Sequence, residues 1–119
     1  MLGIVLNLIL ISLAVLALAA GTSFYVQAKE AGYAAKSKKA LLHGNAKTII
    51  TRQDRSFIKV VYEEESHKVL GAQLMMGRAS DLINEYTEAV ANGLTMEQMA
   101  SLIRPHPTFC EAADDAFAL

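Results

Sequence analysis

The sequence predicts an α+β fold: an antiparallel sheet with helices on one face, preceded by an apolar N-terminal helix. Two apolar, β-branched runs at 57–63 and 69–75 flank a charged stretch, which is typical of a hairpin with a solvated loop. After Gly77 the apolar period changes to that of a helix. The first 28 residues contain no charged side chain. We therefore divide the chain into an apolar leader, 1–26, and a domain, 27–119.

Composition excludes several classes of function. The chain has 119 residues and a net charge of −1, without the basic patch that nucleic-acid binding requires. Cys110 is the single cysteine, which rules out an internal disulfide, a redox pair and a cysteine-built zinc site. Neither G-x-G-x-x-G nor G-K-[ST] occurs. We expect no metal and no resident nucleotide or flavin in this chain.

The leader is predicted to be a transmembrane helix. Residues 2–20 are almost wholly Leu, Ile, Val and Ala, and as a helix they reach roughly 30 Å, the thickness of a bilayer core. The lysines that follow place the domain in the cytoplasm. Two alternatives stay open: a cleaved signal peptide, because 17–19 has a small-x-small pattern, and a non-native N-terminus. A buried core helix is disfavoured because the rest of the chain is too small to surround it.

The first half of the domain is predicted as a helix end, a strand and a turn before the hairpin. Gly32 stops the helix, 33–42 forms the strand, and 43–45 is the turn. The next residues, 46–54, are ambiguous, because the β-branched residues in their centre favour a strand and their neighbours do not. His43 in this turn and His67 in the hairpin tip have no metal-ligand spacing, so both are interpreted as surface residues.

Two helices are predicted after the hairpin. The first has an apolar stripe and ends at Gly93; the stripe consists of Leu82, Ile83, Tyr86, Ala89 and Val90. The second starts with a capping box, in which a Thr side chain and a Gln three residues later satisfy each other's backbone amides. This box is Thr95–Gln98, and the apolar positions after it are Met99, Leu102 and Ile103.

The tail holds the candidate catalytic residues, His106 and Glu111. Pro105 and Pro107 predict an extended turn that presents the histidine between them. A carboxylate beside an imidazole fixes the ring tautomer and stabilises the imidazolium, as a general base requires. Thr108 and Glu111 also match a capping box for a last helix starting near Thr108. The two interpretations of Glu111 are compatible with each other.

These features together resemble the C-terminal dimerisation domain of the flavoprotein disulfide reductases, the pyridine nucleotide-disulfide oxidoreductase family. Within the family the residues are most similar to the dihydrolipoyl dehydrogenase branch. The resemblance covers residues 27–119 and is carried by Gly71–Leu74, Ala79–Glu85, Gly93–Met99 and His106–Ala112. It implies a domain that pairs across a two-fold axis. It also implies that His106 is the acid/base for the redox thiols of a partner subunit, with Glu111 orienting its ring.

The chain also departs from this family. FAD and NAD are the cofactors implied for the full-length proteins, but their binding domains and the C-x-x-x-x-C redox pair are absent here, and the leader begins where the family has a first strand. We expect a dimerisation and acid/base-supplying domain, a homodimer or a reductase subunit, that is inactive alone. The alternative is a membrane-tethered, non-catalytic α+β interaction module that dimerises through its helical face. A degenerate fragment that folds poorly is a third hypothesis.

Overall fold

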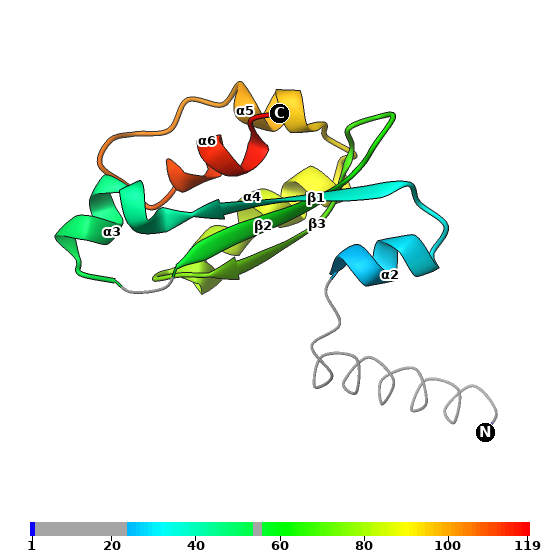
Figure 1. The fold of residues 1–119 in the computed structure, drawn as a ribbon, viewed down its shortest axis with the longest axis horizontal. Coiled ribbons are helices and arrows are strands. Elements are labelled where there is room, and N and C mark those ends of the chain that lie inside the picture. The colour runs from blue at the N-terminus through cyan, green and yellow to red at the C-terminus, as the bar shows by residue number, and fades with distance from the viewer. Residues whose placement is uncertain (2–23, 54–55) are drawn as a thin grey trace.

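The structure, a computed structural model, describes Met1, residues 24–53 and residues 56–119 (Figure 1). The expected apolar helix at 2–20 lies outside the described residues, as does most of the expected leader. In the part of the chain that is described, no helix is long and apolar enough to cross a bilayer. In chain order the elements are α2 (Phe24–Glu30), β1 (Ala35–Leu41), η1 (Leu42–Gly44), α3 (Ala46–Ile50), β2 (Phe57–Glu63), β3 (Val69–Met75), α4 (Ala79–Ala91), α5 (Met96–Ala100) and α6 (Ala112–Phe117).

The three strands form one antiparallel sheet in the order β1-β2-β3. The strands predicted at 57–63 and 69–75 are confirmed with the same bounds, and β1 lies within the predicted 33–42. Alternate side chains of β2 point to opposite faces, so Ile58 and Val60 are buried and lie in the core on one side of the sheet. The sheet therefore supplies an apolar surface for the helices that follow it in the chain.

Helices α4, α5 and α6 cover this face (Figure 1). Helix α6 contacts β1, β2 and α5, while α4 contacts β3. Phe117 of α6 is fully buried and stacks on Tyr86 of α4, with 5.5 Å between ring centroids. Burying a side chain of this size stabilises the fold by about 1.5–3 kcal/mol. The last helix is therefore part of the core, although it has only six residues.

Helix α2 lies against the other face of the sheet. Lys59, between Ile58 and Val60 on β2, points away from the core, and its ammonium lies 5.8 Å from the ring centroid of Tyr25 on α2. Figure 1 shows α2 on the side of the sheet opposite to α6. The prediction of helices on one face is right for α4, α5 and α6 and wrong for α2.

Glycine ends both α2 and α4, as the sequence predicts. Gly32 and Gly93 have φ values of +89° and +62°, a left-handed conformation that costs glycine little. Each glycine lies two residues beyond the end of its helix, and its N–H donates to the carbonyl of the residue three positions earlier in the chain. The N–H of the residue after the glycine donates to the carbonyl five positions earlier in the chain, as from Tyr33 to Ala28. This is a Schellman motif, which satisfies helix carbonyls that would otherwise lack partners.

The structure assigns one ambiguous stretch and corrects one local expectation. The ambiguous stretch 46–54 begins with a short helix, α3, because the Asn45 side chain caps it by accepting the Thr48 N–H at 3.0 Å. The capping box at Thr95 and Gln98 is confirmed, but α5 ends at Ala100. Leu102 and Ile103, expected on its apolar face, instead have 48% and 99% of their surface exposed.

The last helix begins at Ala112, four residues later than predicted. The Thr108 hydroxyl does not cap it, because it donates to the Pro105 carbonyl at 2.7 Å. Only half of the expected capping box forms: the Glu111 carboxylate accepts the Thr108 N–H at 2.9 Å. The residues between α5 and α6 are therefore an ordered turn held by side chains.

Candidate functional site

The segment between α5 and α6 is fixed at its start by Arg104. Its side chain is only 4% exposed and makes ion pairs with Glu85 of α4 and Asp114 of α6. It also donates to the Met99 carbonyl at 3.1 Å. Burial disfavours the charged guanidinium, but the hydrogen bonds and charges of Glu85 and Asp114 outweigh burial and raise the Arg104 pKa. One side chain thus joins both helices to the backbone that precedes Pro105.

His106 and Glu111 are in direct contact at the end of this segment. The imidazole Nδ1 lies 2.8 and 3.1 Å from the two oxygens of the Glu111 carboxylate. The His106 side chain is 69% exposed, whereas the Glu111 side chain is 24% exposed. The peptide bond between His106 and Pro107 is cis. The structure thus brings the two predicted residues together, with an open imidazole and a more enclosed carboxylate.

Hydrogen bonds keep the Glu111 carboxylate ionised. The backbone N–H of Thr108, and secondly the His106 ring, lower the Glu111 pKa below its ordinary value. An ionised carboxylate only accepts hydrogen bonds, so Nδ1 of His106 must be the donor. In the neutral ring the remaining nitrogen, Nε2, then carries the lone pair. The pair can therefore accept a proton at Nε2 and stabilise the resulting positive charge.

Asn45 connects this turn to α3. Its Nδ2 donates to the Thr108 carbonyl at 3.0 Å, while its Oδ1 accepts from the Thr48 backbone N–H and hydroxyl at 3.0 and 3.1 Å. Sequence reasoning placed Asn45 in a turn and assigned it no further role. Its N-cap position is a local pattern that could have been found, but its bond to a residue 63 positions away has no local signal.

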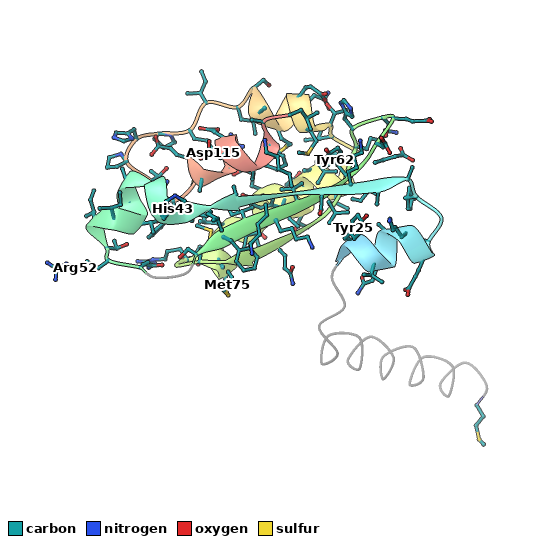
Figure 2. All side chains as sticks on the ribbon, in the orientation of Figure 1. Tyr25, His43, Arg52, Tyr62, Met75 and Asp115 are labelled. Carbon is teal, nitrogen blue, oxygen red and sulfur yellow. The ribbon has the colours of Figure 1, made fainter. Side chains whose placement is uncertain are left out.

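A cavity of about 280 Å³ lies beside the pair, between the start of α3 and α6. Its lining includes the side chains of His106 and Glu111, Asn45 at the start of α3, and Asp115 on α6. Figure 2 marks Asp115 on α6 and His43 at the η1 end of the molecule. His43 is exposed and does not line this cavity. Cys110 is a half-buried free thiol.

His67 has a partner that the sequence did not predict. Its Nδ1 forms an ion pair with Glu97 of α5, and this contact lowers the Glu97 pKa. The His67 ring also packs edge-on to Tyr62, with 6.1 Å between ring centroids. Among residues 24–53 and 56–119, no group of three or more His, Cys, Asp or Glu side chains could hold a metal ion.

Comparison with known proteins gives consistent results for sequence and fold. The family model "Pyridine nucleotide-disulphide oxidoreductase, dimerisation domain" matches residues 21–117. Dihydrolipoyl dehydrogenase of Synechocystis is 33% identical over 95 residues, which are 76% of this chain and 20% of that protein. The Haloferax volcanii enzyme of the same name is 38% identical over 89 residues, 75% of this chain and 19% of that protein.

Solved structures share the fold. LpdA from Mycobacterium tuberculosis superposes with a TM-score of 0.72 at 22% identity, over 77% of this chain and 20% of LpdA. A NAD-dependent persulfide reductase from A. fulgidus superposes with a TM-score of 0.57 at 29% identity, over 68% of this chain and 15% of the reductase. The chain spans about a fifth of the length of the curated relatives it matches.

Proposed function

We propose, on the premise that this chain belongs to the pyridine nucleotide-disulphide oxidoreductase dimerisation domain family, that it supplies two things to a dihydrolipoyl dehydrogenase-like flavoprotein. The first is a dimerisation surface. The second is the acid/base pair His106–Glu111. The observation that carries this proposal is the orientation of the His106 ring, whose Nδ1 is bound by Glu111 while most of the side chain is exposed.

The proposed chemistry is proton transfer to and from a dithiol. A thiol attacks a disulfide only as its thiolate, so a base that removes the proton of a dihydrolipoyl thiol promotes the attack. Nε2 of His106 accepts that proton, and the Glu111 carboxylate stabilises the imidazolium at Nδ1. The substrate thiolate then attacks the redox disulfide, and one sulfur of that disulfide leaves as a thiolate. The second substrate thiol gives its proton to the thiolate just released and attacks the substrate sulfur of the mixed disulfide. The remaining redox sulfur leaves as a thiolate, and the substrate is released as its disulfide.

The redox disulfide in this scheme is assigned to a partner subunit. Cys110 is the single cysteine of the chain, so no redox pair can form within it. Leu102 and Ile103 are exposed immediately before the segment that presents His106, and Ile49 and Ile50 of α3 are 61% and 63% exposed. We assign these exposed apolar side chains to the proposed interface with a partner subunit. A partner subunit that covers them would bring its redox disulfide towards the imidazole.

The flavin and the nicotinamide nucleotide are likewise assigned to another part of the assembly. A pyrophosphate is usually held where a strand passes through a glycine-rich loop into a helix. In residues 24–53 and 56–119 two connections lead from a strand to an α-helix, Leu42–Asn45 between β1 and α3 and Met76–Arg78 between β3 and α4, and each has one glycine. These connections therefore do not fit the pyrophosphate of FAD or NAD. The isolated chain is expected to be colourless and inactive.

A chimera tests this function. The C-terminal fifth of the Haloferax volcanii relative is replaced by the matching part of this chain, and NAD-linked oxidation of dihydrolipoamide is measured. General acid–base catalysis typically contributes 10²–10⁴-fold, so His106→Gln should lower kcat by roughly that factor. His67→Gln is the matched control, since His67 also pairs with a glutamate, and it should leave kcat within about twofold. An active dimer that tolerates His106→Gln would refute the acid/base role.

A further inference from the structure

The oxygen and the nitrogen of the Asn45 side-chain amide contact different parts of the chain. Its Oδ1 faces two donors, the N–H and the hydroxyl of Thr48, while its Nδ2 faces the carbonyl of Thr108. Because the carbonyl cannot donate and the amide N–H cannot accept, the hydrogen-bond network allows only this orientation of the side-chain amide. The oxygen caps α3, and the nitrogen reaches across to the turn that carries the candidate catalytic pair.

We propose that Asn45 is a positioning residue for the His106–Glu111 pair, acting through Thr108. The catalytic importance of this contact rests on the proposed function. The effect of Asn45 on the position of the pair does not depend on that function. Three hydrogen bonds run in series: Asn45 Nδ2 donates to the Thr108 carbonyl at 3.0 Å, the Thr108 N–H donates to Glu111 Oε2 at 2.9 Å, and His106 Nδ1 donates to Glu111 Oε1 at 2.8 Å. The start of α3 thereby fixes where the imidazole points.

Thr108 is held on both sides in this series. Its carbonyl is bound by Asn45, its N–H is bound by Glu111, and its hydroxyl is bound to the Pro105 carbonyl at 2.7 Å. The contact to Asn45 is the one of these three that comes from outside the 105–111 turn. Without it, the turn keeps its internal bonds but loses its attachment to the α3 side of the cavity. Asn45, Glu111 and His106 all line that cavity, so the link lies at the site itself.

The simpler explanation is that Asn45 only caps α3. The two explanations differ in which end of the side chain matters, and serine separates them. Serine is about as good as asparagine at a helix N-cap, so Asn45→Ser preserves the bond to the Thr48 N–H. Its hydroxyl is too short to reach the Thr108 carbonyl as well. Asn45→Gly, which a helix start also tolerates, provides a second variant without the link.

The test is an NMR comparison of the 119-residue chain with these variants. Two quantities are measured: the hydrogen-exchange rate of the Thr108 amide, and the pKa of the Glu111 carboxyl from its side-chain carbon shift. Asn45→Ser should speed Thr108 exchange by roughly fivefold, the equivalent of one ordinary hydrogen bond. It should also raise the Glu111 pKa, because the Thr108 N–H is the main group lowering it. Exchange at the Thr48 amide should not change.

The matched control is Lys47→Gly, which weakens α3 at its half-buried second residue and leaves Asn45 intact. It should speed exchange within α3 without moving the Glu111 pKa. The proposal is overturned if Asn45→Ser and Asn45→Gly leave Thr108 exchange and the Glu111 pKa at wild-type values, or if Lys47→Gly moves them as much. These measurements need no turnover. If they succeed while His106→Gln has no effect in the chimera, Asn45 positions the pair but the pair is not the acid/base.

Discussion

The chain holds two histidine–glutamate pairs, His106 with Glu111 and His67 with Glu97, and they differ in what surrounds the carboxylate. In both pairs Nδ1 of the ring contacts the carboxylate. The Glu111 side chain is 24% exposed and also accepts a backbone N–H. The Glu97 side chain is 57% exposed, on the first turn of a five-residue helix, and its pKa is lowered by His67 and secondly by its own backbone N–H. The exposure of the carboxylate therefore separates the two pairs.

The histidines differ in the opposite sense. The His106 side chain is 69% exposed, whereas that of His67 is 39% exposed and packs on Tyr62. His67 also takes part in the backbone structure, because its N–H donates to the Glu63 carbonyl and its carbonyl accepts from the Met96 N–H. The His67 pair closes the hairpin onto α5. A His–Glu contact is therefore not by itself evidence of a catalytic site. An enclosed carboxylate with an open ring is the arrangement suited to proton transfer.

The largest effect on stability is expected from Arg104, which anchors the turn of the first pair. Arg104→Met leaves Glu85 and Asp114 without their partner, and breaking a buried pair in this way costs about 3–5 kcal/mol. Because Asp114 is 51% exposed, we expect the lower end of that range. Urea unfolding at fixed protein concentration measures the loss. His67→Ala is the comparison, and a loss as large as that of Arg104→Met would make the two pairs equivalent.

A smaller effect is expected from the capping box that supports the second pair. Thr95→Ala removes the side chain that accepts the Gln98 N–H, which should lower the free energy of unfolding by about 1 kcal/mol. Thr95→Ser keeps the cap and serves as the control. If the exposed His67–Glu97 contact were the main support of α5, His67→Ala would cost more than Thr95→Ala.

The pH dependence of stability should separate the two carboxylates. Both Glu111 and Glu97 have a lowered pKa in the folded chain, so each stabilises the fold fully above the unfolded carboxyl pKa of about 4.3. This stabilisation is lost as the pH falls through the folded pKa. Glu111→Gln should therefore reduce the drop in urea midpoint between pH 6 and pH 3, and Glu97→Gln should reduce it less. If Glu97→Gln reduced this drop more than Glu111→Gln does, the proposed difference between the two carboxylates would be wrong.

The smallest effect is expected at His67 itself. Its φ is +56°, a conformation that glycine adopts without the cost paid by other residues. His67→Gly therefore relieves the backbone while it removes an exposed ion pair worth about 0.2–1 kcal/mol. The two effects should cancel to within about 0.5 kcal/mol in the free energy of unfolding. His67→Asn, which tolerates the same backbone, checks the contribution of the ring, and a large loss in both variants would show that the pair is structural.

Local signals in the sequence predicted the parts of the fold that local chemistry decides. The apolar, β-branched runs predicted both hairpin strands, and Gly32 and Gly93 predicted two helix ends. Thr95 and Gln98 set the start of α5. In each case the determining groups lie within a few residues of one another, so propensity and hydrogen bonding agree without help from the rest of the chain.

Contacts between distant residues were not visible in the sequence. The β-branched centre of α3 favours a strand, but Asn45 caps it as a helix and attaches it to Thr108. Nothing near Arg104 in the sequence reveals its pairing with Glu85, 19 residues away. His106 and Glu111 are five residues apart, so their contact could be anticipated from the sequence. The contacts of Arg104 and Asn45 that hold this pair in place could not be anticipated from the sequence. Their catalytic role is still a prediction.

The Arg104 anchor has a consequence for association. The turn that follows it is already ordered in the single chain, because Arg104 fixes its start and Asn45 attaches its middle. A binding partner therefore does not have to freeze this turn, and ordering a flexible surface is one of the main costs that weaken a complex. The conformation of this turn should therefore change little when the partner binds. Its association should accordingly show little of the large unfavourable entropy that accompanies folding on binding.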